Sequence, residues 1–233
     1  MGSIPDNLQA VKGRIAGAAR AAGREPAAVT LLAVSKNHAP ALIEQAYGAG
    51  QHAFGENYVQ EAAEKMDALA ALPIEWHLVG PLQSNKTRLV AERFQWVHTI
   101  DREKIARRLS EQRPEALPPL EVLVQVNVSG EASKSGVAPG EVPALAKVVA
   151  NLPRLRLRGL MSVPEPTADE RTRHARFREV RELYESLKRS GLKLDTLSMG
   201  MTADMQAAVA EGSTMVRIGT AIFGERQKAK DAA

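Results

Sequence analysis

A lysine follows directly on an apolar run near the start of the chain. Lys36 comes after residues 29–35 (VTLLAVS), a run typical of a strand that is buried on both faces. A lysine in this place usually reaches into solvent, and taken alone that interpretation is favoured. If the amine is partly buried or has a positive neighbour, its pKa falls and it becomes a nucleophile. Lys36 is therefore a candidate for a Schiff base with an aldehyde.

Two glycine-containing turns near the C-terminus supply a second kind of chemistry. Ser198 and Gly200 lie in SMGMT (198–202), and Gly219 and Thr220 follow Arg217 in RIGT (217–220). Glycine lets the backbone approach an anion, free amides point at it, and hydroxyls add donors. Each turn alone is typical of an ordinary loop. Together with Lys36, they indicate a ligand that carries both an aldehyde and a phosphate, and pyridoxal 5′-phosphate (PLP) is such a ligand.

Several other polar side chains remain open to two interpretations. Asn57 either donates to a ligand hydroxyl or caps the helix expected from residue 58. Arg217 is either paired inside the sheet or directed at the ligand. Lys134 lies in a polar loop (129–136), where a solvated lysine is favoured over a second, transient aldehyde site. Further candidates for the rim of the site are His77, Gln83, Asn85 and Lys86. There is no cysteine and no HExxH motif, so no metal site is expected. The sequence also has no P-loop and no GxSxG motif.

The elements that must position these residues alternate along the whole chain. Alternating strands and helices indicate a parallel sheet with crossover helices, and eight units fit a closed (β/α)₈ barrel of the α/β class. In such barrels the chemistry lies at the carboxyl ends of the strands, and phosphates bind after strands seven and eight. The predicted strands are 29–35, 53–54, 75–79, 95–98, 120–128, 156–161, 196–198 and 215–218, and the predicted helices are 8–22, 40–47, 58–69, 86–92, 102–111, 142–151, 169–190 and 203–211.

Length and composition restrict the class of protein. The 233 residues suit one barrel domain over 1–233, in which helix 8–22 precedes the first strand and the tail 226–233 is frayed. Without cysteine, a basic-apolar leader or a run of about 18 apolar residues, we expect a cytoplasmic protein with no membrane partner. The net charge is +4, but the arginines between residues 154 and 181 alternate with acidic residues, which favours solvated helix faces with i,i+4 pairs over nucleic-acid binding. No long apolar surface stretch demands a dimer, so we expect a monomer.

Six segments together resemble one known family. They are LLAVSK (31–36), FGENYVQE (54–61), WHLVGPLQSNK (76–86), GLMSV (159–163), LSMGMTADM (197–205) and VRIGTAIFGER (216–226), which occur in the family's order across most of the chain. The sequence resembles the YggS/PROSC family of PLP homeostasis proteins. The resemblance implies a PLP-binding barrel like the N-terminal domain of alanine racemase (fold type III). It also implies that Lys36 is the Schiff-base residue, that Ser198, Gly200, Gly219 and Thr220 lie at the phosphate, and that Arg217 faces the pyridine nitrogen.

Three functions compete for such a site. The preferred one is a non-catalytic carrier that takes part in PLP homeostasis and passes the cofactor to PLP-dependent apo-enzymes. The alternative is a racemase-like PLP enzyme, which needs a second acid–base group opposite the lysine. Among Tyr47, Tyr58 and Tyr184, only Tyr58 falls near the end of a predicted strand. A sugar-phosphate isomerase would explain the phosphate turns but not Lys36 and Arg217 together.

Overall fold

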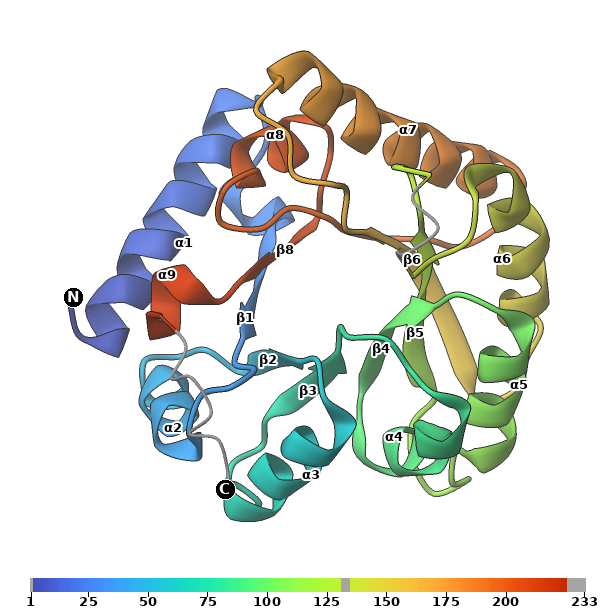
Figure 1. Ribbon diagram of the computed structural model, residues 1–233, viewed down its shortest axis with the longest axis horizontal. Coiled ribbons are helices and arrows are strands. Elements are labelled where there is room, and N and C mark those ends of the chain that lie inside the picture. Colours follow the sequence, from blue (N-terminus) through green and yellow to red (C-terminus); the bar gives the residue numbers. More distant parts are fainter. Residues whose placement is uncertain (1, 131–134, 226–233) are drawn as a thin grey trace, which may run out of the picture.

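The computed structural model describes residues 2–130 and 135–225. Within them, eight parallel strands close into a barrel in chain order, and β8 pairs with β1 (Figure 1). Closure leaves no strand edge unpaired, and it confirms the predicted (β/α)₈ architecture. The strands are β1 (Thr30–Val34), β2 (Ala53–Glu56), β3 (Glu75–Leu78), β4 (Trp96–Ile100), β5 (Leu120–Val126), β6 (Leu155–Ser162), β7 (Thr196–Ser198) and β8 (Met215–Ile218).

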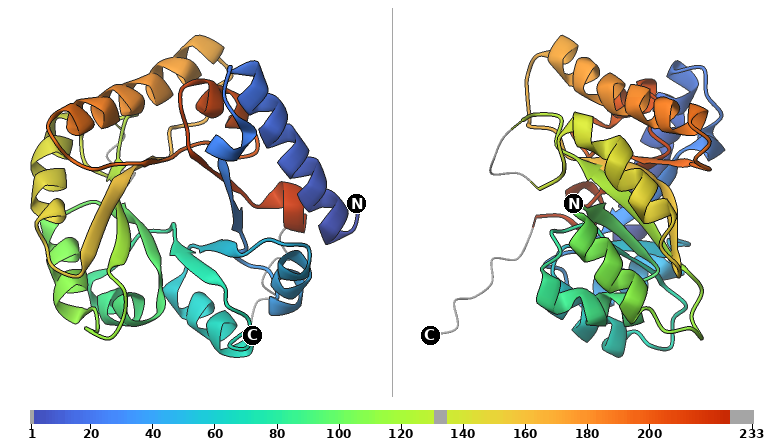
Figure 2. Two further views of the ribbon diagram at one scale, coloured as in Figure 1. Left: turned by 180° about the vertical axis from the view of Figure 1, so that it is seen from behind. Right: turned by 90° about the vertical axis from the view of Figure 1, so that its right-hand side faces the viewer.

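Helices form a ring around the barrel, as Figures 1 and 2 show from both ends and from the side. The helix α1 lies beside α8 and α9 and occupies the outer position between α8 and α2 (Figure 1). The helices are α1 (Ile4–Ala21), α2 (Pro40–Gly48), α3 (Val59–Ala68), α4 (Thr87–Arg93), α5 (Glu103–Gln112), α6 (Val142–Ala150), α7 (Glu170–Arg189), α8 (Met205–Ala210) and α9 (Thr220–Phe223); single 3₁₀ turns cover Pro26–Ala28, Ser84–Lys86 and Pro139–Glu141.

The first helix begins at Ile4 rather than at residue 8. Its start is set by a capping box in which the Ser3 hydroxyl accepts from the Asp6 amide, while the Asp6 carboxylate accepts from the Ser3 amide. This reciprocal pair satisfies two donors that a helix start otherwise leaves open. Periodicity alone missed it, because the box precedes the regular apolar pattern. The short helix α9, directly after β8, was not predicted either.

Two layers of side chains fill the fold. Residues on the outer face of the strands pack beneath the helices in one continuous apolar cluster. Inside the barrel, Trp96, Leu123 and Met161 form a small separate cluster. Buried polar side chains also lie inside the barrel, and two of them, Ser198 and Arg217, are at the carboxyl ends of the strands. Polar groups are therefore present where a barrel site is expected.

The arginine-rich region is largely neutralised by ion pairs. Arg158 binds Asp195 and Glu121, and Arg178 binds Glu211. The sequence had suggested partners one helical turn away, but these partners lie on other elements of the fold. No helix in residues 2–130 and 135–225 is long and apolar enough to cross a bilayer.

Candidate functional site

A pocket of ≈ 330 Å³ opens at the carboxyl ends of the strands. Two cavities of ≈ 380 Å³ lie elsewhere in the described part of the chain, so volume alone does not select the site. The lining of the first pocket selects it, because this lining brings together a lysine, an arginine and two threonines from opposite ends of the sequence. The pocket is lined by Val34, Lys36, His38, Asn57, Val79, Val163, Met201, Thr202, Ala203, Arg217, Gly219 and Thr220.

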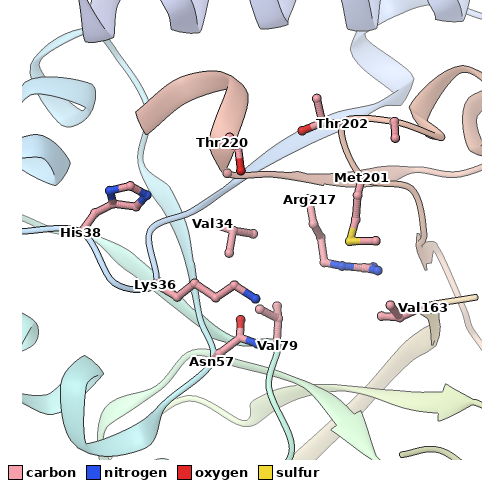
Figure 3. Close-up of a pocket in the computed structure, with 12 residues that line it drawn as sticks. Val34, Lys36, His38, Asn57, Val79, Val163, Met201, Thr202, Arg217 and Thr220 are labelled. Atoms are coloured by element: carbon pink, nitrogen blue, oxygen red, sulfur yellow. The ribbon is translucent and has the colours of Figure 1, made fainter. Parts of the chain in front are cut away.

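Lys36 enters the pocket because it continues the inward face of β1. Side chains alternate along a strand, so Val34 and Lys36 point the same way, and both line the cavity. Figure 3 shows the Lys36 side chain extending into the pocket between Val34 and Asn57. Lys36 thus lies at the barrel mouth, where the sequence analysis expected it, and its role as a nucleophile stays a prediction.

Arg217 lies deeper in the pocket and is held by backbone and side-chain acceptors. Its Nη1 donates to the Ser198 carbonyl at 2.6 Å and to the Ser198 Oγ at 2.8 Å, and its Nη2 donates to the Ser162 carbonyl at 2.8 Å. A guanidinium has five N–H donors, so donors remain for a ligand in the pocket. Burial lowers the pKa of Arg217 to about 10, against the attraction of Asp204, so the group is charged at neutral pH.

The two glycine turns meet on one side of the pocket. Gly219 and Thr220 line it directly, and so does Thr202, which the sequence analysis had not singled out. Gly200 has φ +95°, and a Cβ there would lie 2.6 Å from the Ala208 Cβ. Only glycine therefore fits this turn, which carries Thr202 to the pocket. Ser198 and Gly200 themselves are not among the lining residues.

Asn57 lines the pocket and does not cap the following helix. The N-cap of α3 is Tyr58, and no side chain caps its amides. The Oδ1 atom of Asn57 is buried without a hydrogen-bond partner in the described part of the protein. Gly80 packs against the Asn57 backbone so closely that a Cβ would lie 2.2 Å from the Asn57 carbonyl oxygen. The helix-cap interpretation of Asn57 is therefore wrong, and the ligand interpretation stays a prediction.

The other candidates lie away from the pocket. Gln83, Asn85 and Lys86 sit in or next to the 3₁₀ turn after β3, and His77 is buried inside the barrel below the pocket. Lys134 lies outside the described residues, as does the predicted frayed tail 226–233. Among residues 2–130 and 135–225, no group of three histidine, aspartate or glutamate side chains is arranged to hold a metal ion.

Comparison with known proteins identifies the family. The profile of the alanine racemase N-terminal domain matches residues 7–227. The pyridoxal phosphate homeostasis protein of Pseudomonas aeruginosa is 60% identical over 226 residues, covering 97% of each chain, and that of Escherichia coli is 52% identical over 99% of this chain and 100% of the other. The chain belongs to the pyridoxal phosphate homeostasis protein family.

Solved structures of this family and of alanine racemase share the fold. PipY of Synechococcus elongatus, solved with PLP bound, is 36% identical with a TM-score of 0.83, and covers 95% of this chain and 100% of that one. Alanine racemase of Clostridium difficile is 13% identical with a TM-score of 0.76, and 58% of its chain is covered. The second likeness shows the fold only: the barrel has the architecture of PLP fold type III.

The pocket of this homeostasis-family chain fits PLP in its polar groups. It combines an amine, a buried guanidinium and two hydroxyl groups, and the orphaned Oδ1 of Asn57 marks a polar position without a protein partner. An aldehyde, a ring nitrogen and a phosphate match these groups in kind. The sequence analysis missed Thr202 and His38, although Thr202 lies inside one of the motifs that carried the resemblance.

Two buried histidines predict an acid-sensitive fold for this family member. Burial is the main cause that lowers the pKa of His77, and Glu75 opposes this shift. Burial also lowers the pKa of His98, well below its ordinary 6.5, and the nearby Arg217 lowers the pKa of His98 further. The unfolded chain therefore binds more protons than the native state below pH 6.5, so the free energy of unfolding falls as the pH drops.

This prediction is checked by urea denaturation between pH 7 and pH 5. We expect the loss of stability to be smaller in His98→Gln, which cannot take up the proton. An equal loss in both proteins would contradict it.

Proposed function

We propose that this protein binds PLP through Lys36 and takes part in intracellular PLP (vitamin B6) homeostasis, with little or no turnover of amino acids. The observation that carries the proposal is the convergence of Lys36, Arg217 and Thr220 on one pocket. It is supported by the 60% identity to a pyridoxal phosphate homeostasis protein. We further propose that the protein works in the cytoplasm as a monomer and passes PLP to apo-enzymes that require it.

Each lining group has a part in holding the cofactor. When bound, PLP supplies an aldehyde that reacts reversibly with amines and a ring that withdraws electrons. The Lys36 amine is the tether for the aldehyde, Arg217 donates to the ring nitrogen, and Asn57 donates from its amide to the ring hydroxyl. Gly219, Thr220 and Thr202 face the phosphate, and Ser198 and Gly200 shape the loop that carries Thr202. This arrangement follows the use of the loops after strands seven and eight, and of a short extra helix, for phosphate in other barrels.

The chemistry of Arg217 and of the lining favours a carrier over a racemase. An arginine keeps its proton, so it leaves the ring nitrogen unprotonated and weakens the electron withdrawal that carbanion chemistry requires. A racemase also needs a second acid–base group. Besides Lys36 and Arg217, the ionisable side chain among the lining residues is His38, whose ring packs against Phe223 and lies away from the Lys36 amine (Figure 3).

The proposal is tested by adding PLP to the purified protein. We expect the visible absorbance of lysine-bound PLP, and after borohydride treatment an intact mass increased by one pyridoxyl phosphate group. Racemisation assays with amino acids should then show no rate above background. A protein that stays colourless with added PLP would refute PLP binding, and a robust rate dependent on Lys36 would refute the carrier role.

The phosphate side of the pocket gives a prediction of its own. Thr220→Val keeps the shape of the side chain but removes a hydroxyl donor to a charged group, so PLP affinity should fall about tenfold. Pyridoxal, which has no phosphate, should bind the variant and the parent protein equally in the same absorbance titration. Equal losses of affinity for PLP and for pyridoxal would show that Thr220 does not contact the phosphate.

A further inference from the structure

A line of polar side chains crosses the inside of the barrel from Arg217 to the opposite end. Arg217 Nη1 lies 2.8 Å from the Ser198 Oγ, and the Ser198 Oγ lies 3.0 Å from His98 Nδ1. His98 Nε2 lies 2.9 Å from His77 Nδ1, and His77 Nε2 lies 2.8 Å from Glu75 Oε1. Four strands contribute to this line, which we call the interior chain: β8, β7, β4 and β3.

The interior chain is dry except at its far end. The side chains of His77, His98 and Ser198 are fully buried, and Arg217 is nearly so, whereas half of the Glu75 side chain is exposed. The His77 ring is stacked on the Trp96 ring, with 5.2 Å between their centroids. The Arg158 guanidinium lies over the same Trp96 ring, at 4.9 Å from its centroid. Buried polar groups need partners, and here each is satisfied by the next.

The Glu75 end of the interior chain fixes the direction of the two hydrogen bonds nearest to it. The hydrogen bond from His77 lowers the pKa of the Glu75 carboxyl, so this group is ionised and only accepts. His77 Nε2 therefore carries the proton that Glu75 accepts. Because burial keeps His77 neutral, its Nδ1 has no proton and accepts from His98 Nε2.

The same direction continues to the pocket end. A guanidinium only donates, so the Ser198 Oγ accepts from Arg217 and has its own proton to donate. His98 is neutral and has its proton on Nε2, which leaves Nδ1 to accept the Ser198 proton. All four hydrogen bonds consequently run from Arg217 towards Glu75.

We propose that Glu75, His77, His98 and Ser198 are positioning residues that hold the Arg217 guanidinium towards the ligand through this one-directional chain. The proposal rests on the proposed function, in which Arg217 donates to the ring nitrogen of PLP. The carboxylate at the far end sets both histidine tautomers, and these direct the Ser198 proton to His98, so that a lone pair of the Ser198 Oγ stays turned towards Arg217. Ser198 and the carbonyl of Ser162 then occupy donors on both terminal nitrogens of Arg217, so the guanidinium plane has one orientation.

The direction of the chain is tested without any cofactor. Nitrogen-15 NMR of the PLP-free protein should show His77 and His98 neutral, each protonated on Nε2, at neutral pH. Glu75→Leu removes the acceptor that sets the order, so the two rings should then show mixed tautomers. A proton on Nδ1 of either ring in the parent protein would overturn the proposal.

The positioning role is tested with a pair of matched variants and a pair of ligands. Ser198→Ala removes the acceptor next to Arg217. Ser213→Ala is the control, because its buried hydroxyl also lies between β7 and β8 but, among the described residues, bonds to the carbonyls of residues 197, 199 and 215 and not to Arg217. Affinity is measured for PLP and for its 1-deaza analogue, which has no ring nitrogen to accept from Arg217.

We expect Ser198→Ala to weaken PLP binding about tenfold and to leave the binding of the deaza analogue unchanged relative to Ser213→Ala. Equal effects of the two variants on PLP, or equal effects of Ser198→Ala on both ligands, would overturn the positioning role. A parent protein that binds neither ligand refutes the proposed function instead, and the NMR experiment still decides whether the interior chain has the stated direction.

Discussion

Lys36→Ala is expected to abolish the visible absorbance of bound PLP and the borohydride-stable increase in mass. Lys36 continues the inward face of β1 and lies in the pocket with Arg217 and Thr220. Alanine removes the amine, and with it the atom that bonds to the aldehyde. Ring and phosphate contacts remain, so the variant should still bind PLP, but reversibly and without the lysine-bound spectrum.

The fold should not change in this variant. Lys36 is partly exposed, and substitutions of such side chains usually alter stability by about 0.5 kcal/mol or less. Lys86→Ala is a matched control, because Lys86 is also partly exposed, at the end of the 3₁₀ turn Ser84–Lys86, but does not line the pocket. It should keep both the absorbance and the added mass. A pyridoxyl group that remained on Lys36→Ala after borohydride would show that another lysine is the tether.

The sequence predicted the barrel well because its signals are local. Most strands are short apolar runs and most helices are amphipathic, and all eight predicted strands are present. The errors lie at the ends of elements, where side-chain hydrogen bonds decide. The capping box of Ser3 and Asp6 starts α1 early, and α9 is too short for any periodicity.

The site was predictable where residues follow strand ends and unpredictable where distant strands meet. Lys36, Asn57, Arg217, Gly219 and Thr220 all line the pocket, as their positions after or within strands suggested. The interior chain could not be read from the sequence. His77 and Ser198 are 121 positions apart, and only barrel closure brings β3, β4 and β7 to a common interior.

A second group that sequence reasoning missed lies behind Lys36. Lys65 is buried, and its Nζ donates to the Ser35 carbonyl at 2.7 Å, to Glu56 at 2.8 Å and to Glu61 at 2.6 Å. The Ser35 hydroxyl donates to the same Glu56 oxygen at 2.6 Å. The signal in the sequence was weak, because Glu61 and Lys65 have the i,i+4 spacing of an ordinary surface pair.

Lys65→Met is expected to lower the free energy of unfolding by about 3–5 kcal/mol. Methionine fills a similar volume, so the loss comes from charge and not from a cavity. Without Lys65, the buried Glu56 carboxylate has no cation, and its Oε2 is already without a partner in the described part of the protein. The measurement is urea denaturation, with Lys188→Met as the control. Lys188 pairs with Glu185 on the surface at 3.8 Å, a kind of pair worth about 0–1 kcal/mol.

The loss of stability in Lys65→Met should depend on pH in a defined direction. Burial raises the pKa of the Glu56 carboxyl above its ordinary 4.5, and Lys65 opposes this rise. Removing Lys65 raises the pKa further, so the folded variant holds a proton that the unfolded chain has lost. Stability then increases as the pH falls. The deficit relative to the parent protein should be largest at neutral pH and should shrink towards pH 4.5; a constant deficit would show that Glu56 is not the cause.

Lys65 also connects this ion cluster to the site. Its partner Glu61 accepts from the backbone amide of Asn37 at 2.6 Å, and Asn37 has a φ of 61°. The backbone on both sides of Lys36 is therefore tied to one cluster, by the Ser35 carbonyl and by the Asn37 amide. We expect Lys65→Met to weaken PLP binding under conditions in which it is still folded, while Lys188→Met binds like the parent protein. If binding were unchanged in the folded Lys65→Met protein, the direction of Lys36 would be set by β1 alone.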